Sequence, residues 1–268
     1  MIIHAIEAPV FNVSNVTSTQ GESVWITYAN GNVNLNNIHV DRATDAGVYI
    51  DTAGEIIANN ISATYNNIRG AILYGAAGVS LTGTNVFNHN VGDGLVISTA
   101  GSITLENVTA SHNTATGAYL FGGTITITGT NFFDDNVLYG GEFYGTELSL
   151  DGVSFSGNDI AGLSATSVGD VTLNNVIASE NTSDGIWVQS DGGNMVLSNL
   201  TASKNSSGAT FVGASTVTLT GRNVFNDNSA MGLGIDAAGD IKVSNVTANS
   251  NSDGISLFSA FGAISIDG

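Results

Sequence analysis

Cysteine is absent from this chain of 268 residues, and proline occurs once, at Pro9. Without cysteine, the protein can form neither a disulfide framework nor a thiolate metal site. Basic residues are also scarce, since five lysines and arginines stand against 23 aspartates and glutamates and leave a formal net charge of −18. Five dispersed cations cannot follow a phosphate backbone, which argues against nucleic acid and anionic membranes as partners.

The sequence also lacks a targeting segment and a membrane-spanning segment. Residues 1–7 have neither the basic start nor the long apolar stretch of a signal peptide, and no apolar window is long enough to cross a bilayer. Residues 264–268 stop inside a repeat without a distinct cap, although natural solenoids need one. We therefore expect a piece of a longer exported protein, located outside the cell or on its surface.

A glycine opens the same short phrase ten times, and successive members lie 22–24 residues apart. These glycines are Gly47, Gly70, Gly94, Gly117, Gly140, Gly162, Gly185, Gly208, Gly232 and Gly254. Apolar residues alternate with others after each one, as in residues 94–97 and 185–188. A fixed period of this size is typical of stacked structural repeats. We expect one solenoid over residues 1–268, with repeats over residues 21–268 and a partial first coil or N-terminal edge over residues 1–20.

Each repeat is predicted to hold three short strands. In the repeat at residues 94–116, apolar residues alternate over 95–98, 103–105 and 108–110. The apolar period is two rather than 3.6, so helices are a poor alternative. Alignment of the repeats predicts two columns of inward side chains that stack along one axis. One column comprises Ile50, Leu73, Ile97, Leu120, Phe143, Ala165, Val188, Phe211, Ile235 and Leu257. The other comprises Leu81, Leu105, Ile127, Leu150, Leu173, Leu197, Leu219, Val243 and Ile266.

An asparagine ends the third strand of each repeat, just before the next glycine. These asparagines are Asn90, Asn113, Asn136, Asn158, Asn181, Asn205, Asn228 and Asn251. Asparagine tolerates a left-handed backbone, and stacked side-chain amides can hydrogen-bond along the axis. We therefore predict a structural ladder at this corner, with left-handed backbone at the asparagines, rather than a ligand site.

Two phrases carry a resemblance to a known superfamily: Ala-Ser-Glu-Asn-Thr-Ser-Asp-Gly-Ile at residues 178–186 and Ala-Asn-Ser-Asn-Ser-Asp-Gly-Ile at residues 248–255. They resemble the right-handed parallel β-helix repeats of the pectin-lyase-like superfamily, and the likeness covers about residues 20–268. It implies an all-β solenoid of about eleven coils, with three strands and about 23 residues per coil. It implies little about activity, because that superfamily holds polysaccharide lyases and hydrolases, epimerases, phage tailspikes and non-catalytic adhesin-like arrays.

Two adjacent carboxylates are the best catalytic candidates. Asp134 and Asp135 lie within residues 131–136, and an inverting glycosidase needs two carboxylates about 6.5–9.5 Å apart. The pair resembles the aspartates of β-helical polygalacturonases, but the Gly-His-Gly and Arg-Ile-Lys motifs of those enzymes do not occur here. Sister repeats carry Asn-His at residues 88–89 and Asn-Asp at residues 226–227, so we interpret the pair as variation at an exposed corner.

No cofactor is expected. Oxygen ligands for Ca²⁺ are plentiful, which leaves Ca²⁺ as the alternative, but Asp93, Asp184 and Asp253 directly precede repeat glycines, where Asp-Gly is ordinary turn chemistry. His89 and His112 fall in one column on adjacent coils, which would allow a weak surface metal contact. Two solvated polar residues are the simpler interpretation.

The outward positions of the first strand are unexpectedly apolar. They hold Tyr49, Ile72, Tyr74, Val96, Tyr119, Phe121, Tyr144, Trp187, Val212 and Phe258. Contiguous exposed apolar surface usually marks an interaction site. We predict a binding surface made of Tyr49, Tyr74, Tyr119, Phe121, Glu142, Tyr144 and Trp187. In one interpretation the face binds a sugar, with Asp51 and Glu142 as polar partners. In the other, a flanking segment or another copy of the chain covers the face.

The residues therefore favour a rigid extracellular stalk or adhesin without enzymatic activity, which binds a protein or polysaccharide through its aromatic face. A carbohydrate-active enzyme, a hydrolase or lyase that uses Asp134 and Asp135 beside the face of Tyr119 and Tyr144, is the alternative. A third hypothesis is a fibre subunit that associates end to end, because unpaired strand edges are templates for pairing.

Overall fold

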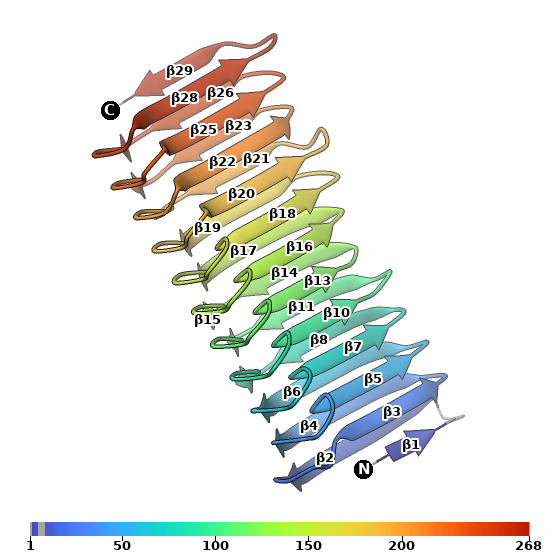
Figure 1. Cartoon of the computed structure of the whole chain (residues 1–268). Helices are drawn as coiled ribbons and strands as arrows, with labels where there is room; N and C mark the ends of the chain where they lie inside the picture. The colour runs from blue at the N-terminus through green and yellow to red at the C-terminus, as the bar shows by residue number, and fades with distance from the viewer. Residues whose placement is uncertain (1, 5–8, 268) are drawn as a thin grey trace.

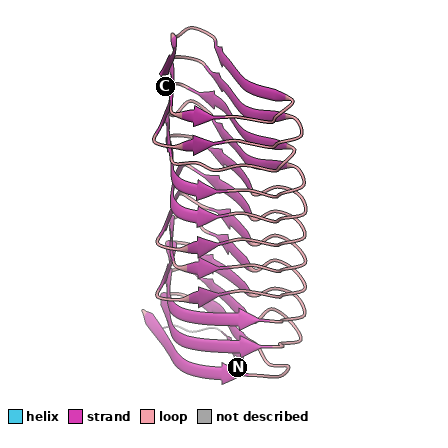
Figure 2. Ribbon diagram, turned by 90° about the vertical axis from the view of Figure 1, so that its left-hand side faces the viewer, coloured by secondary structure: helices cyan, strands magenta, loops and turns pink. Residues whose placement is uncertain are grey.

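A computed structural model describes residues 2–4 and 9–267 of the chain and shows a parallel β-solenoid (Figure 1). Every strand pairing is parallel, and the partner is the equivalent strand one coil away. The coils stack in a straight column in which equivalent turns lie above one another (Figure 2). The described residues contain no helix that could cross a membrane. The predicted all-β fold of about eleven coils is confirmed.

Two large sheets and one small one make up the solenoid. Sheet A contains, in spatial order, β1 (Ile2–His4), β3 (Val24–Ala29), β5 (Val48–Thr52), β7 (Ala71–Gly75), β10 (Leu95–Ser98), β13 (Ala118–Phe121), β16 (Gly141–Gly145), β18 (Leu163–Ser167), β20 (Asp184–Ser190), β22 (Ser207–Ala214), β25 (Met231–Ala237) and β28 (Asp253–Ser259). Sheet B contains β2 (Val10–Ser18), β4 (Asn32–Asp41), β6 (Glu55–Thr64), β8 (Gly78–Thr82), β9 (Asn85–Val86), β11 (Ser102–Glu106), β12 (Val108–Thr109), β14 (Thr124–Thr128), β15 (Asn131–Phe132), β17 (Glu147–Ser154), β19 (Val171–Ile177), β21 (Met195–Ser198), β23 (Val217–Thr220), β26 (Ile241–Ser244) and β29 (Ile264–Asp267). The small sheet pairs β24 (Asn223–Val224) with β27 (Val246–Thr247).

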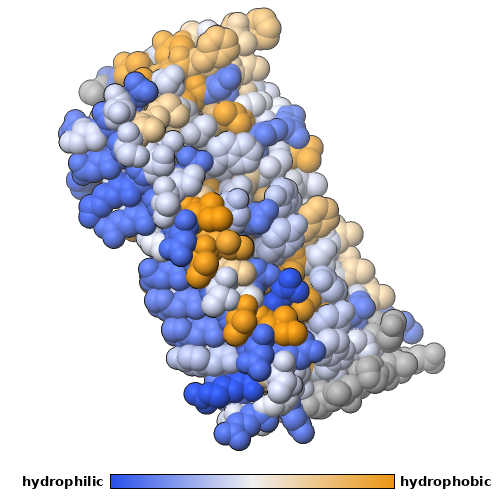
Figure 3. Space-filling model, viewed as in Figure 1, coloured by the Kyte–Doolittle hydropathy of each residue, from blue (hydrophilic) through white to orange (hydrophobic). Residues whose placement is uncertain are grey.

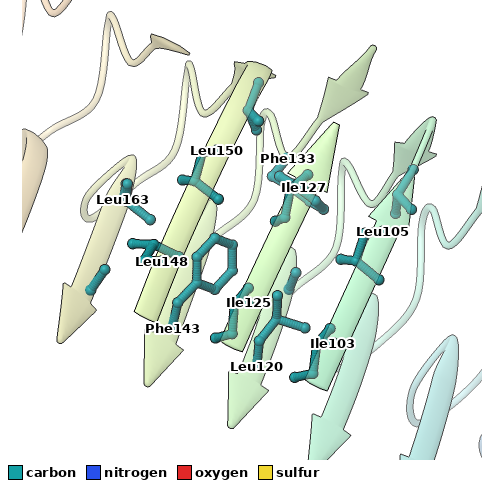
Figure 4. Close-up of a cluster of buried hydrophobic side chains, with 14 of the residues drawn as sticks. Ile103, Leu105, Leu120, Ile125, Ile127, Phe133, Phe143, Leu148, Leu150 and Leu163 are labelled. Carbon is teal, nitrogen blue, oxygen red and sulfur yellow. The ribbon is translucent and has the colours of Figure 1, made fainter. Parts of the chain in front are cut away.

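The two predicted aliphatic columns form the core. Leu120 pairs in register with Ile97 on one side and Phe143 on the other, and Ile127 pairs with Leu105 and Leu150 in the same way. Side chains of both columns meet in the middle of the coil (Figure 4). The columns are buried until the last coil, so each coil contributes apolar area that only its neighbours can cover.

The predicted asparagine ladder is present and begins one coil earlier than expected, at Asn66. The side-chain amide of Asn136 donates to Oδ1 of Asn158 at 3.1 Å, and the amide of Asn158 donates to Oδ1 of Asn181 at 3.0 Å. The same Oδ1 atoms also accept the backbone N–H of the asparagine one coil earlier. Each asparagine therefore satisfies a buried backbone donor that the turn would otherwise leave without a partner.

The left-handed backbone lies one residue earlier than predicted. The ladder asparagines do not have positive φ, whereas the residue before each does, as at His89 (58°), His112 (57°) and Asp135 (56°). The prediction of left-handed asparagines at this corner was therefore wrong. A left-handed residue turns the chain sharply. The side chain of the left-handed residue faces solvent, and the side chain of the following asparagine points inward.

The repeat glycines are required by close approach between coils. A Cβ atom on Gly185 would lie 2.6 Å from the carbonyl oxygen of Gly208, from Nδ2 of Asn205 and from the carbonyl oxygen of Ala178. Gly185 does not have positive φ, so conformational freedom is not the reason for the glycine. The glycine of one coil leaves space for the backbone of the next.

The first and last described coils differ from the middle ones. Strands β1 and β2 extend the two sheets by pairing with β3 and β4. In the last coil, Ile255 and Ile266 occupy core positions but are 43% and 67% exposed. The core columns are thus open to solvent at this end of the described chain.

Candidate ligand-binding face

The outer surface of sheet A carries two columns of outward side chains. The first column runs through Trp25, Tyr49, Ile72, Val96, Tyr119, Glu142, Ser164 and Trp187. The second runs through Asp51, Tyr74, Ser98, Phe121, Tyr144 and Thr166. Adjacent members are one strand spacing apart, about 4.8 Å. Both columns arise because alternate residues of a strand face opposite sides of the sheet.

The first column is more covered than the sequence predicts. Ile72 and Val96 are only 8% and 9% exposed, and they pack with Ala46 between the half-buried rings of Tyr49 and Tyr119. The expectation that Ile72 and Val96 form exposed apolar surface is therefore wrong, because Ala46 and the flanking rings of Tyr49 and Tyr119 pack against them. Figure 3, which views this side of the molecule, shows apolar patches separated by polar residues.

The second column forms the floor of a shallow groove. One part has a volume of about 360 Å³ and is lined by Asp51, Thr52, Tyr74, Ala76, Ser98, Thr99, Ala100 and Phe121. The next part, of about 240 Å³, is lined by Phe121, Gly122, Tyr144, Gly145, Thr146, Thr166 and Val168. Phe121 lines both, so the two parts adjoin at its ring and together extend across six strands, a length of about 24 Å at the usual strand spacing. We call this feature the sheet A groove.

Exposed rings stand along the groove at the points where sheet A strands end. Tyr74 is 37% exposed and Phe121 is 53% exposed, while Tyr144 is half-buried. The turn residues beside them are small, chiefly alanine and glycine, and leave the faces of the rings accessible. An open trough with spaced aromatic rings and a few polar groups suits an extended ligand with alternating apolar and polar surface.

The groove carries negative and no positive charge among its lining residues. Asp51 lines one end, and the hydroxyl of Tyr144 donates a 2.6 Å hydrogen bond to Oε1 of Glu142. This bond and partial burial raise the pKa of Tyr144 to about 12, so its ring stays neutral and fixed in orientation. Three of the five cations are held elsewhere, in ion pairs of Arg42, Arg69 and Lys204 with acidic neighbours.

The structure gathers only part of the predicted binding surface. Tyr74, Phe121 and Tyr144 line the groove, and Glu142 contacts it through Tyr144. Tyr49 and Tyr119 belong to the covered first column, although Tyr49 packs edge-on to Tyr74 with ring centroids 5.9 Å apart and Tyr119 lies 5.9 Å from Tyr144. Trp187 lies outside the groove, between Ser164 and Thr210 in its column.

Sequence reasoning missed Trp25, which stacks on Tyr49 with ring centroids 4.2 Å apart and an interplanar angle of 12°. The repeat glycine was the marker for each first strand, and this coil carries Ser23 at the corresponding position. The alternation of residues 24–26 is the signal that would have found it, because Trp25 there faces outward between two buried residues.

Asp134 and Asp135 lie at the opposite end of β16 from the groove, at the corner before the ladder asparagine. Oδ1 of Asp134 accepts the backbone N–H of Ser156 at 2.7 Å and the hydroxyl of Ser154 at 2.8 Å. Asp135 is exposed and lies 3.8 Å from Nε2 of His112. Burial is the main cause that raises the pKa of Asp134, and its two hydrogen bonds oppose that rise.

Asp134 also belongs to a second polar ladder that the sequence did not suggest. Asn88 and Ser111 hold the equivalent positions in the two preceding coils, and each side-chain oxygen accepts a backbone N–H from the coil after it. Ser156 and Ser179 continue the series. The carboxylate of Asp134 therefore accepts the same backbone hydrogen bond that a hydroxyl or an amide oxygen accepts in other coils, which is a structural role. No group of three or more metal-ligating side chains is assembled in the described part of the chain.

The chain is a β-solenoid, as its parallel coils, inward columns and uniform period show. Comparison with protein families indicates which kind of solenoid it resembles. Residues 139–268 match the family model described as the right handed beta helix region. This part of the chain is therefore similar to right-handed β-helix regions. The resemblance to right-handed parallel β-helix repeats is thereby confirmed, and the pectin-lyase-like superfamily fits this family. Comparisons with curated proteins and with solved structures found no significant match.

Proposed function

We propose that this β-helix is a non-enzymatic adhesive scaffold that binds an extended, uncharged polysaccharide along the sheet A groove. The observation that carries the proposal is the alignment of Tyr74, Phe121 and Tyr144 in one column along the two adjoining parts of the groove. Aromatic rings present flat apolar surface to the apolar face of a sugar, while nearby polar groups accept its hydroxyl protons.

The charge of the face selects among polysaccharides. Asp51 and Glu142 are the acidic groups at the groove, its lining residues include no base, and the whole chain carries −18. A polymer of uronic acids would bring like charges together, which weakens association. A neutral glycan avoids this repulsion and still offers hydroxyl donors to the two carboxylates. The scaffold would be extracellular, as part of a longer exported protein.

Binding to a series of purified polysaccharides tests this function. We expect a neutral β-glucan or mannan to bind, and polygalacturonate not to bind, by calorimetry or affinity electrophoresis. Phe121→Ala should weaken binding at least tenfold, because central aromatic contacts commonly contribute more than about 1.4 kcal/mol. Phe258→Ala is the matched control, since Phe258 is 59% exposed in the same column but lies outside the groove.

Three results would overturn the proposal. One is that neutral glycans do not bind at any practical concentration, and another is that Phe258→Ala weakens binding as much as Phe121→Ala. The third is a dimer in light scattering that Phe121→Ala dissociates, which would show that a second copy covers the groove.

A carbohydrate-active enzyme is the second candidate, and the raised pKa of Asp134 is the observation that favours it. A general acid must hold a proton at the working pH, and burial of Asp134 acts in that direction. Release of reducing ends or unsaturated products from any polysaccharide, abolished by Asp135→Asn, would establish this activity in place of the scaffold function.

End-to-end assembly is the third candidate, and the exposed core positions Ile255 and Ile266 favour it. Strands β28 and β29 are edge strands of the two sheets, paired on one side with β25 and β26, and their other edges offer backbone donors and acceptors to another chain. Assembly predicts a mass that rises with concentration in light scattering, whereas a constant monomer mass contradicts it.

A further inference from the structure

The corner of left-handed residues carries a row of side chains that the proposed function does not use. Tyr65, His89, His112 and Asp135 occupy this corner in four successive coils, with φ between 55° and 58°. Because their backbone conformation is the same, their Cα–Cβ bonds point in the same direction, toward solvent. Equivalent side chains then lie one above another along the axis.

The two imidazoles are stacked and accessible. The rings of His89 and His112 are nearly parallel, with centroids 4.9 Å apart and an interplanar angle of 7°. Tyr65 covers the other face of His89 at 4.7 Å. Both histidines are exposed, and their nitrogen-bearing edges can therefore be reached from solvent.

From this arrangement we propose that His89 and His112 together bind one divalent transition-metal ion, such as Cu²⁺ or Zn²⁺. Imidazole is a preferred ligand for both ions, and each metal–nitrogen bond is about 2.0–2.1 Å long, so two ligand nitrogens lie no more than about 4.2 Å apart. Each imidazole lone pair lies in the plane of its ring, so the parallel rings, with centroids 4.9 Å apart, do not converge on one ion as stacked. Rotation of the two exposed side chains out of the stack brings one nitrogen of each within bonding distance of the same ion. With two protein ligands, water fills the remaining coordination positions.

Asp135 supplies the group that orients one ligand. Its Oδ2 lies 3.8 Å from Nε2 of His112, on the side away from His89. Metal-bound histidines commonly donate their second ring N–H to a carboxylate, which fixes the tautomer and raises the basicity of the ligating nitrogen. The 3.8 Å separation is an ion-pair contact that a small movement of the exposed Asp135 side chain shortens to a hydrogen bond, and this role assigns Nδ1 of His112 to the metal. The net charge of −18 also favours the approach of a cation.

Titration of the intact chain with Cu²⁺ or Zn²⁺ in calorimetry tests the site, with excess Ca²⁺ present to occupy carboxylates. We expect one ion per chain, and nitrogen hyperfine structure from two imidazoles in the electron paramagnetic resonance spectrum of bound Cu²⁺. His89→Asn and His112→Asn should each lower the affinity at least tenfold, and Asp135→Asn about tenfold. Asparagine tolerates the left-handed backbone, so these variants should fold, which circular dichroism checks.

His39→Asn is the matched control, because the strand neighbours of His39 are Thr17 and Ser62 rather than a histidine. It should leave metal binding unchanged. The proposal is overturned if His89→Asn and His112→Asn bind the metal as the unaltered chain does. It is equally overturned if no ion binds in calorimetry, or if the spectrum shows a single nitrogen ligand.

Discussion

Replacement of Gly185 by alanine should destabilise the solenoid, although alanine normally favours folding. A methyl group at this position meets the carbonyl oxygens of Ala178 and Gly208 and Nδ2 of Asn205, all at 2.6 Å. Ordinary contacts of such atoms lie near 3.5 Å, so each neighbour must move by almost 1 Å. Two of the three atoms belong to the backbone of hydrogen-bonded coils and cannot move independently.

The magnitude follows from two opposing contributions. Overpacking of a well-packed interior costs about 3 kcal/mol at the upper end of its usual range. Replacing glycine by alanine also restricts the unfolded chain, which stabilises the folded state by about 0.4–1 kcal/mol. We therefore expect Gly185→Ala to lower the free energy of unfolding by about 2 kcal/mol.

Gly254→Ala is a closely matched control, because both glycines stand in the sequence Ser-Asp-Gly-Ile. Among the described residues, a Cβ atom at Gly254 meets only the carbonyl oxygen of Ala248, at 3.7 Å. This variant should be neutral or up to about 1 kcal/mol more stable.

Urea unfolding followed by circular dichroism, with hydrogen exchange resolved by coil, measures both variants. Exchange is needed because solenoids can unfold locally rather than in one step. If both variants changed the free energy of unfolding equally and in the same direction, the view that contact between coils requires the glycine would be refuted.

Three further predictions concern polar side chains. Asn158→Ala should lower the free energy of unfolding by about 2–4 kcal/mol in chemical denaturation, because it leaves the buried backbone N–H of Asn136 without an acceptor and removes one of the two acceptors of the Asn136 side-chain amide, which keeps the carbonyl oxygen of Ala110. Asp134→Asn should stabilise the protein by less than about 1 kcal/mol at neutral pH. Because the pKa of Asp134 is raised in the folded protein, ionisation of Asp134 opposes folding at pH values above that pKa. The stabilisation by Asp134→Asn should therefore vanish in acid, where the unaltered carboxyl is protonated. Glu142→Gln should bring the pKa of Tyr144 down from about 12 toward its ordinary value of 10, in a titration followed by NMR.

The inward columns and the asparagine ladder were predictable because they repeat at every coil. The alternation in residues 95–98 fixes which side chains face inward, and the uniform period brings Leu120 onto Ile97 without further information. The backbone at the corner was not predictable in the same way. Both Asp135 and Asn136 favour turns, and only the path of the chain shows that Asp135 takes the left-handed conformation and Asn136 faces inward.

The candidate site was predictable only in part. Phe121 and Ile72 both occupy outward positions, and alternation along a strand cannot distinguish them. The turn that contains Ala46 covers the column of Ile72, whereas the small residue Gly122 leaves Phe121 exposed at the other end of its strand. Exposure depends on how turns fold over the neighbouring column, and that is a property of several coils together.

The sequence by itself determined the scaffold, because a period of about 23 residues, an apolar alternation of two and a recurrent Asn and Gly leave a parallel solenoid as the solution that buries every repeat. Tertiary structure decided which outward side chains are accessible and which meet. The groove along Tyr74, Phe121 and Tyr144 and the stacked pair His89 and His112 each join residues from different coils. Such neighbours are set by the register of one coil on the next, and a single repeat does not contain that register.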